Sequence, residues 1–302
     1  QLGFNLISSP IARNLAAPSW QFYASRMESL VSTDWLAEHL AEPDLLVVDA
    51  SWHMPASGRS GREEYLHAHI PGARFLDIDE LSARSNPAPH MLPSAADFGA
   101  AMERLGIGRD DRIVVYDNSP IHTSARGWFT LRHFGATNVA ILDGGFAKWL
   151  AERRPTEAGE SGRRDARFEA SEVPDAVTKE DILAGTGCAL VDARGKGRFE
   201  ATEPEPRPGM AGGHIPRARN LPFGLLFDDQ GCFRSKDEIR RAFDGAGLDP
   251  SKPFIASCGS GVTATSLIFA AHLLGGDAGK LYDGSWSEWG ADPSTPKAVG
   301  PA

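Results

Sequence analysis

The sequence predicts an α/β protein made of two tandem copies of one domain, each a mainly parallel sheet flanked by helices. Three observations support this. The chain has 302 residues, more than a single small core requires. Blocks of sequence recur in the same order at an offset of roughly 140 to 145 residues, the mark of an internal repeat. Within each copy, short apolar runs alternate with helix-period segments, a pattern typical of α/β domains.

Four pairs of segments carry the repeat. They are LLVVDASW (45–52) with CALVDARG (188–195), HIPGARFLDID (69–79) with HIPRARNLPF (214–223), RIVVYDNSPIHTSARGWFTLRHFG (112–135) with PFIASCGSGVTATSLIFAAHLLGG (253–276), and ILDGGFAKW (141–149) with LYDGSWSEW (281–289). Because all four pairs keep their order, duplication of a domain is the natural explanation.

The first copy opens with a helix after Ser32 or Thr33, either of which is a suitable N-terminal cap. Near-continuous apolar runs that end at a polar residue predict buried parallel strands. Helical spacing that ends at a glycine predicts the helices between them. The expected strands are 45–50, 112–117 and 138–144, and the expected helices are 95–107 and 124–135.

The second copy repeats this arrangement. We expect strands at 189–193, 253–258 and 279–284, and helices at 236–248 and 264–276. In parallel sheets, ligands gather beyond the carboxyl ends of the strands. Because Cys258 ends the second of these strands, it lies where a ligand is expected.

Four regions follow from the repeat. Residues 1–26 form an N-terminal extension, which is a tag, an artefact or an arginine-containing presequence. Residues 27–155 form a first, catalytically silent domain. The charged, glycine-containing stretch 156–172 has no periodic apolar face and is the expected linker. Residues 173–295 form the second, catalytic domain.

Composition excludes several classes of function. A formal charge of −9 argues against binding to nucleic acid or an anionic membrane surface. No apolar run approaches the roughly 18 residues of a membrane span. Three cysteines without close pairing argue against a disulfide framework or a zinc cluster, so we expect no metal and no cofactor. A reducing, cytoplasmic location is the simplest expectation, or a mitochondrial one if residues 1–26 are a native presequence.

The loop CGSGVT begins with a single cysteine, Cys258, and opens an apparent helix. A free thiol ionises only near pH 8.5, so reactivity requires a group that stabilises the thiolate. Gly259 and Gly261 allow backbone N–H groups and the helix N-terminus to face the sulfur. Ser260 and Thr263 add hydroxyl donors. The alternative is an ordinary turn with a small buried cysteine.

The repeat places Asp117 where Cys258 stands, so the fold itself needs no thiol at this position. We therefore expect one active site per chain, in the second copy. A cysteine phosphatase would need an arginine six residues after the cysteine, to grip phosphate. That position is Ala264, and Ser257 precedes the cysteine instead of a histidine, so the phosphatase hypothesis fails.

These residues resemble a known family. CGSGVT (258–263), PHMLP (89–93), GRFEATEPEPR (197–207) and YDGSWSEW (282–289) are similar to the 3-mercaptopyruvate sulfurtransferases of the rhodanese superfamily. The resemblance extends over about 28–292. It implies two tandem rhodanese-like domains with the active site in the second, near the domain interface. Thiosulfate sulfurtransferases usually carry basic residues inside this loop, which has none here.

The resemblance implies a sulfurtransferase activity. Sulfur would pass from 3-mercaptopyruvate to Cys258, forming a persulfide and releasing pyruvate. The persulfide would then pass to a thiol acceptor such as reduced thioredoxin, or to cyanide. Two alternatives remain open: a thiosulfate sulfurtransferase, which has the same fold but another donor, and a non-catalytic persulfide carrier.

The family pattern also implies roles for individual residues. Cys258 is the nucleophile, with a Ser-His-Asp arrangement that matches Ser260, His90 and Asp79. The residues matched to substrate binding are Arg198, Arg207, Gly259, Gly261, Val262 and Thr263. Planar guanidinium groups suit the carboxylate and keto oxygens of the donor. This interpretation requires a thiol that solvent reaches and that faces both arginines.

Less specific roles compete with these. The two arginines are also suited to surface ion pairs with the glutamates of GRFEATEPEPR. His90 is suited to tying down a loop, and Asp79 to capping a helix that begins at Glu80.

Overall fold

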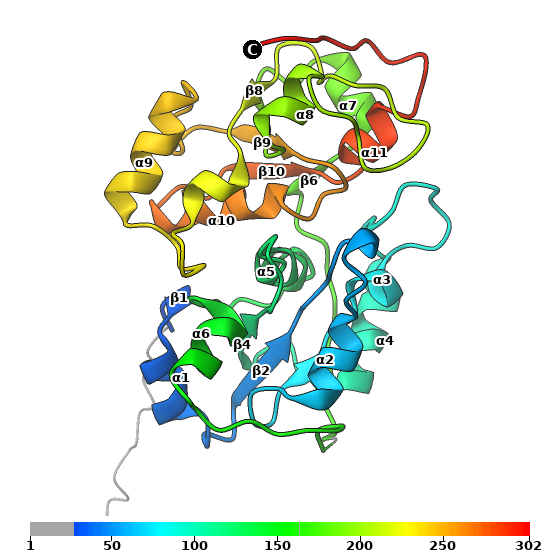
Figure 1. Ribbon diagram of the computed structural model, residues 1–302. Coiled ribbons are helices and arrows are strands. Elements are labelled where there is room, and N and C mark those ends of the chain that lie inside the picture. The colour runs from blue at the N-terminus through cyan, green and yellow to red at the C-terminus, as the bar shows by residue number, and fades with distance from the viewer. Residues whose placement is uncertain (1–26, 163) are drawn as a thin grey trace, which may run out of the picture.

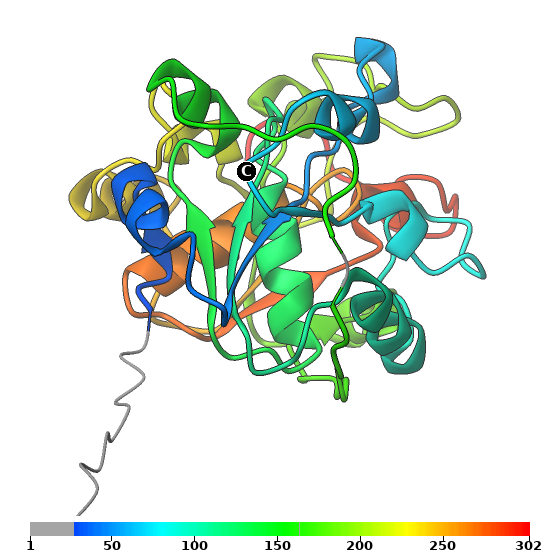
Figure 2. The same ribbon diagram turned by 90° about the horizontal axis from the view of Figure 1, so that it is seen from below.

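The computed structural model describes residues 27–162 and 164–302, so the extension expected at 1–26 lies outside the described residues. These residues form two domains, each built on a five-stranded sheet in which every strand pair is parallel. Figure 1 shows the two domains one above the other. Seen from below, in Figure 2, one domain lies behind the other, with little offset. The predicted α/β class is confirmed.

The first sheet has the strand order β1-β5-β4-β2-β3. Its strands are β1 (Leu30–Val31), β2 (Leu45–Asp49), β3 (Arg74–Phe75), β4 (Arg112–Tyr116) and β5 (Val139–Leu142). The first domain's helices are α1 (Thr33–His39), η1 (Pro55–Ser57), α2 (Gly61–His67), α3 (Ile78–Leu81), α4 (Ala95–Leu105), α5 (Ser124–His133) and α6 (Gly145–Ala151).

The second sheet repeats this topology as β6-β10-β9-β7-β8. Its strands are β6 (Ala176–Val177), β7 (Ala189–Asp192), β8 (Arg219–Asn220), β9 (Phe254–Ser257) and β10 (Gly279–Tyr282). The second domain's helices are α7 (Lys179–Ala184), α8 (Lys196–Glu200), η2 (Phe223–Leu226), α9 (Lys236–Gly245), α10 (Ala264–Leu273) and α11 (Ser285–Trp289).

The central strands and long helices lie where periodicity predicts them. Ser32 caps α1, since its side chain accepts a hydrogen bond from the Trp35 amide. Sequence patterns missed the four edge strands, each of which has only two residues. Two residues are too few to show an alternation of apolar and polar side chains.

Strand register fixes which residues of the two domains correspond. Asp49 pairs with Tyr116 in the first sheet, and Asp192 pairs with Ser257 in the second. Asp117 and Cys258 each follow the second member of their pair. The structure therefore confirms that these two residues occupy equivalent positions, one in each domain.

Helices α5 and α10 form the centre of the domain interface, where they pack against each other. Almost all residues of both helices are buried. A helix that is buried on every side has neighbours on every side. The Trp128 ring of α5 meets the Phe269 ring of α10 edge to face, with 4.8 Å between centroids. Figure 1 shows α5 end-on between the two domains.

The stretch expected as a linker contains no helix or strand in its described part. It still packs on the first domain. Glu157 forms an isolated bridge with His69, and Phe168 is buried with its ring edge against Phe98. The exact boundaries 156–172 stay a prediction. Among the residues placed in the structure, no helix is both long and apolar enough to cross a lipid bilayer.

Candidate active site

Cys258 follows β9 directly and opens the loop that leads into α10. The loop turns at Gly261, which has a φ of +75°. A Cβ added there would lie 2.8 Å from the Asp283 carbonyl oxygen, so both the backbone conformation and the close approach favour glycine. Val262 is 2% exposed and Thr263 is the N-cap of α10 without a side-chain capping bond. The loop thus has the expected strand–turn–helix geometry.

The amide groups of this loop are only partly available to the sulfur. The Ser285 hydroxyl oxygen accepts hydrogen bonds from the amides of Cys258 (3.0 Å) and Gly261 (3.1 Å). Within the described residues, the amides of Gly259, Ser260 and Val262 donate to no other group. The loop's N–H groups were expected to face the thiolate. Two of them do not, because they donate to the Ser285 hydroxyl oxygen instead of to the sulfur.

Ser285 itself stands in an unusual conformation. Its φ is +50°, in the left-handed region that disfavours residues with a side chain. The equivalent residue of the first domain, Gly145, has a φ of +54°. The second domain thus places a serine where the fold suits glycine. Strained residues of this kind cluster at functional sites. The difference between DGG and DGS in the repeat was the sequence signal, and sequence analysis missed it.

The Ser-His-Asp arrangement is assembled across the domain interface. His90 Nδ1 lies 2.8 Å from the Ser260 hydroxyl, and His90 Nε2 lies 3.1 Å from Asp79 Oδ1. Asp79 and His90 come from the first domain, whereas Ser260 comes from the catalytic loop of the second. The structure therefore brings together all three residues that the sequence matched to a proton relay.

Asp79 is held by two neighbours. Its hydrogen bond with His90 lowers the pKa of the Asp79 carboxyl group, and the Trp52 indole N–H donates to Asp79 Oδ2 at 2.8 Å. The Trp52 ring also meets the His90 ring edge to face, with 4.7 Å between centroids. Asp79 does not cap the short helix α3. Asp77 does so, through the amides of Asp79 and Glu80.

Both candidate substrate-binding arginines reach the catalytic loop. A Cβ placed on Gly259 would lie 3.2 Å from Arg198 Nη2 and 3.9 Å from Arg207 Nη1. Burial lowers the pKa of Arg207, and the neighbouring Cys258 thiolate acts in the opposite direction. Both guanidinium groups therefore lie beside the residue that follows the nucleophile.

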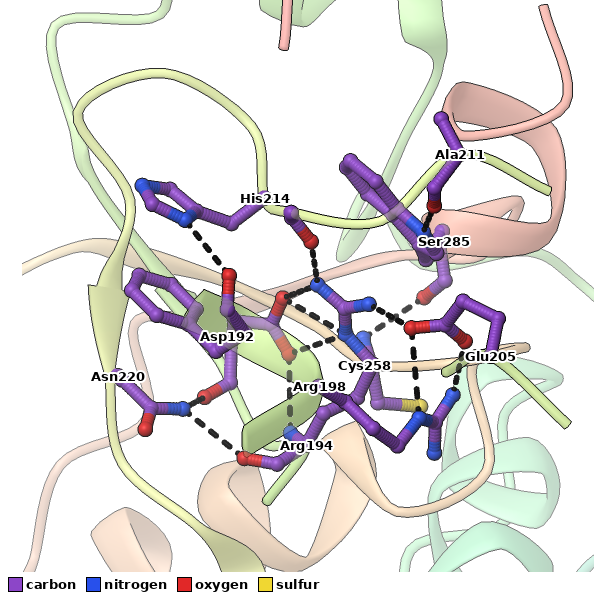
Figure 3. Close-up of polar contacts among 12 residues, drawn as sticks. Asp192, Arg194, Arg198, Glu205, Ala211, His214, Asn220, Cys258 and Ser285 are labelled. Atoms are coloured by element: carbon purple, nitrogen blue, oxygen red, sulfur yellow. Dashed lines mark hydrogen bonds and ion pairs between the residues drawn. The ribbon is translucent and has the colours of Figure 1, made fainter. Parts of the chain in front are cut away.

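A chain of ion pairs extends from Arg198 into the interior of its own domain (Figure 3). Glu205 accepts a hydrogen bond from Arg198 Nη2 and another from Arg194 Nη1, each at 2.6 Å. Arg194 Nη2 in turn donates to Asp192 Oδ2 at 2.6 Å. The Glu205 side chain is only 3% exposed. Arg198 therefore forms the ion pair with a nearby glutamate that was its alternative role. The same contact also orients its guanidinium group.

The charges along this chain of ion pairs stabilise one another. Burial alone would lower the pKa of Arg194, but Asp192 and Glu205 more than offset it, and the pKa lies above its ordinary value. Arg207 differs from Arg198 here. Among the residues described, no carboxylate forms an ion pair with Arg207, whose Nη1 donates to the Ser287 hydroxyl at 3.3 Å. Arg207 is thus the cation with more freedom to meet an anionic ligand.

The thiol of Cys258 is not open to solvent in this structure, since the residue is 1% exposed. The expectation of a thiol that solvent reaches is wrong for this arrangement of side chains. The cause is its place at a buried strand end between the two domains.

The described residues contain no group of three His, Cys, Asp or Glu side chains placed to hold a metal ion. The chemistry available at the site is that of a thiol, two guanidinium groups and a hydroxyl–imidazole–carboxylate relay. A nucleophile flanked by cations is suited to attack on an anionic donor.

Comparison with known proteins agrees with this site. The rhodanese-like domain family matches residues 32–152 and 167–292. The chain belongs to the rhodanese family, with two tandem domains. It is 42% identical over 271 residues to 3-mercaptopyruvate sulfurtransferase of Mus musculus, an alignment that covers 86% of this chain and 91% of the relative.

Other relatives extend the comparison. Thiosulfate sulfurtransferase of Rattus norvegicus is 40% identical over 272 residues, with 86% of this chain and 91% of the relative covered. The crystal structure of SseA from Escherichia coli, described as a 3-mercaptopyruvate sulfotransferase, superimposes with a TM-score of 0.78. It is 39% identical, and 87% of this chain and all of that chain are covered. This rhodanese is therefore an enzyme of the sulfurtransferase class.

Proposed function

We propose that the chain transfers sulfur from 3-mercaptopyruvate to a thiol acceptor through a persulfide on Cys258, and releases pyruvate. The observation that carries this proposal is the placement of Arg198 and Arg207 beside Gly259, the residue after the nucleophile. The donor has a carboxylate next to a keto group. Two guanidinium groups on one side of a thiol are suited to hold that pair of oxygens.

The first step is attack of the Cys258 thiolate on the donor's sulfur atom. A sulfur–sulfur bond forms and the donor's carbon–sulfur bond breaks. The electron pair of the broken bond leaves with the carbon as the enolate of pyruvate. Guanidinium groups near the keto oxygen stabilise this developing negative charge, which is the largest contribution that a preorganised site offers.

A proton must move to balance the step. The donor enters with a thiol proton, and the enolate needs one proton at carbon to become pyruvate. The Ser260 hydroxyl, backed by His90 and Asp79, provides a route from the sulfur to the carbon. The persulfide that remains is then an anion. Because Asp79 has a lowered pKa, it stays ionised and supports the charged imidazole that forms during the transfer.

The second step regenerates the enzyme. An acceptor thiolate attacks the outer sulfur of the persulfide, a new sulfur–sulfur bond forms, and the Cys258 thiolate leaves. We propose a protein dithiol such as reduced thioredoxin as the acceptor, and cyanide as an alternative acceptor that yields thiocyanate. Neither step requires an external oxidant or a metal.

Thiosulfate is the competing donor. The two relatives named above differ in donor, yet they share 42% and 40% identity with this chain, so overall identity does not decide between them. The residues between Cys258 and the start of α10 support mercaptopyruvate as the donor. None of the five residues 259–263 is basic. A doubly charged inorganic donor is better served by a cation inside the loop than by two outside it.

The test is the rate of pyruvate release from 3-mercaptopyruvate with reduced thioredoxin, measured beside thiocyanate formation from thiosulfate and cyanide. We expect repeated turnover with mercaptopyruvate and at least a tenfold lower kcat/KM with thiosulfate. A preference for thiosulfate would overturn the choice of donor. Release of a single equivalent of pyruvate, with no turnover in the presence of either acceptor, would identify a persulfide carrier instead.

A further inference from the structure

Arg126 is a buried arginine of the silent domain that reaches into the active site of the other domain. It lies on α5 and is 3% exposed. Its Nη1 atom donates to the Gly261 carbonyl oxygen at 3.2 Å and to Asp283 Oδ1 at 2.7 Å. Its Nη2 atom donates to the His90 carbonyl oxygen at 2.5 Å. One guanidinium group thus joins three separate segments.

These contacts lie on both sides of the His90–Ser260 hydrogen bond. The His90 carbonyl belongs to the imidazole's own residue, and Gly261 follows Ser260 directly. Asp283 adds a fourth tie, because its second carboxylate oxygen accepts a hydrogen bond from the Leu92 amide at 2.5 Å. The Arg126–Asp283 pair therefore holds the backbone of both partners of the relay.

The backbone of His90 needs such support. Its φ is +64°, a left-handed conformation that a residue with a side chain adopts only when its surroundings enforce it. The bond from Arg126 to the His90 carbonyl is one such constraint. Without it, we expect the His90 backbone to relax and the imidazole to leave Ser260.

We propose that Arg126 is a positioning residue that assembles the Ser260–His90–Asp79 relay across the domain interface. The inference rests on the function proposed above, since the relay serves that reaction. It also gives the silent domain a defined part in the chemistry. The fork of the guanidinium group is essential, because Arg126 uses two separate nitrogen atoms for these contacts, whereas a lysine ammonium group carries all its donors on one nitrogen atom.

The competing explanation is that Arg126 is only a tie between the domains. The two explanations differ in what a substitution changes. A structural tie contributes to stability, and its loss lowers activity independently of His90. A positioning residue acts through His90, so its loss adds nothing once His90 is gone. It also changes kcat more than KM, because Arg198 and Arg207 hold the donor and stay in place.

The experiment is a double-mutant cycle with Arg126→Lys and His90→Asn, read as kcat for pyruvate release. We expect each single variant to lose about 10- to 100-fold in kcat, with KM changed by less than about threefold. The double variant should lose no more than His90→Asn alone. Losses that multiply, or a rise in KM with unchanged kcat, would overturn the proposal.

Arg132→Lys is the matched control. Arg132 lies on the same helix, and its Nη1 atom is 3.4 Å from His272 Nε2 in the second domain, so it also bridges the interface. The guanidinium carbon of Arg132 also lies 4.7 Å from the centre of the Trp128 ring. We expect its kcat to equal that of the unmodified protein, with a similar shift in unfolding temperature to Arg126→Lys.

A readout without turnover separates this inference from the proposed function. The ring ¹⁵N resonances of His90, assigned with the His90→Asn variant, report its hydrogen bond with Ser260. We expect these resonances to shift in Arg126→Lys and to stay unchanged in Arg132→Lys, whether or not mercaptopyruvate is the donor. Unchanged resonances in Arg126→Lys would contradict the positioning role even if mercaptopyruvate turnover is confirmed.

Discussion

The loop after β4 in the first domain and the loop after β9 in the second occupy equivalent positions but are stabilised in different ways. In the first, the Asp117 carboxylate accepts hydrogen bonds from the amides of Ser119 (2.8 Å) and Ser124 (2.7 Å). In the second, Ser285 binds two loop amides from outside the loop. The silent domain therefore closes its loop with its own anion, whereas the catalytic domain leaves that place to the sulfur of Cys258.

A second pair of equivalent residues shows the same contrast in charge. Asp49 is buried and forms no ion pair with any described residue, and burial raises its pKa to about 7. Asp192 is equally buried but forms an ion pair with Arg194, which replaces Ser51 of the first domain. Arg194 continues through Glu205 to Arg198. The duplication has thus built a charge chain toward the active site in one copy only.

The largest expected difference between the two loops concerns the nucleophile. Cys258→Ser should lower pyruvate release by at least about a thousandfold, because a hydroxyl is far less nucleophilic than a thiolate toward sulfur. Asp117→Asn should leave kcat unchanged and only reduce stability, since one of the two acceptor oxygens becomes an NH2 group that cannot accept a hydrogen bond from a loop amide. Steady-state pyruvate assays on both variants check this. Loss of turnover in Asp117→Asn would show that Asp117 itself takes part in the reaction.

Substitution by asparagine is expected to change the free energy of unfolding in opposite directions at the two buried aspartates, Asp192 and Asp49. Asp192→Asn should lower the free energy of unfolding by roughly 3–4 kcal/mol, because Arg194 keeps its buried charge with one carboxylate fewer. Asp49→Asn should raise it at pH 8 by at most about 4 kcal/mol, since the native state no longer buries an ionised carboxylate.

The effect of Asp49→Asn on the free energy of unfolding is expected to depend on pH. The folded pKa of Asp49, about 7, lies above its ordinary value of 3.8, so the native state binds the proton more tightly. Stability from this group is complete below the ordinary pKa and declines as the pH rises to about 7. Urea unfolding of the Asp49→Asn variant should therefore agree with the unmodified protein near pH 4 and exceed it at pH 8. An equal difference in the free energy of unfolding at both pH values would contradict a raised pKa of the buried Asp49 carboxyl group.

Arg198 and Arg207 differ in how firmly they are paired, and this predicts different kinetics. Arg207→Ala should lower kcat/KM for mercaptopyruvate by about 100-fold, because this cation has no carboxylate partner among the described residues to share its charge. Arg198→Ala should cost less, about tenfold, and also release Glu205. Initial rates over a range of donor concentrations test the order. Equal losses of kcat/KM in the two variants would mean that an ion pair with a carboxylate does not determine how much each arginine contributes to catalysis.

Glu205→Gln should affect catalysis less than either arginine substitution. The amide oxygen keeps one hydrogen bond, so Arg198 loses orientation but gains net positive charge toward the donor. We expect KM to change by less than about fivefold and the unfolding temperature to fall, because Arg194 then lacks one partner. A loss as large as that of Arg198→Ala would make Glu205 indispensable to donor binding.

The sequence predicted the parts of this molecule that repeat or that are long. Strands such as β4 and helices such as α9 are long enough to show their period. The resemblance of CGSGVT and GRFEATEPEPR to a family located Cys258, Arg198 and Arg207, and the structure places them together. The serine–histidine–aspartate set was identified by that resemblance, not by spacing.

Contacts between distant residues could not be predicted in the same way. Arg126 and Asp283 are 157 positions apart and look like ordinary helix and loop residues until the domains are docked. Ser285 is important because of a left-handed backbone angle, which one sequence does not reveal. The burial of Cys258 is likewise a property of two domains packed together, so a strand end that looks open in sequence is closed in the fold.

The most direct test of the central claim is the intact mass of the protein after one turnover with 3-mercaptopyruvate in the absence of an acceptor. The account predicts a gain of one sulfur atom on Cys258, matched by one equivalent of pyruvate, and loss of that sulfur when reduced thioredoxin is added. The Cys258→Ser variant should gain nothing. A sulfur found on Cys188 or Cys232 instead, or pyruvate release without any sulfur on the protein, would contradict it.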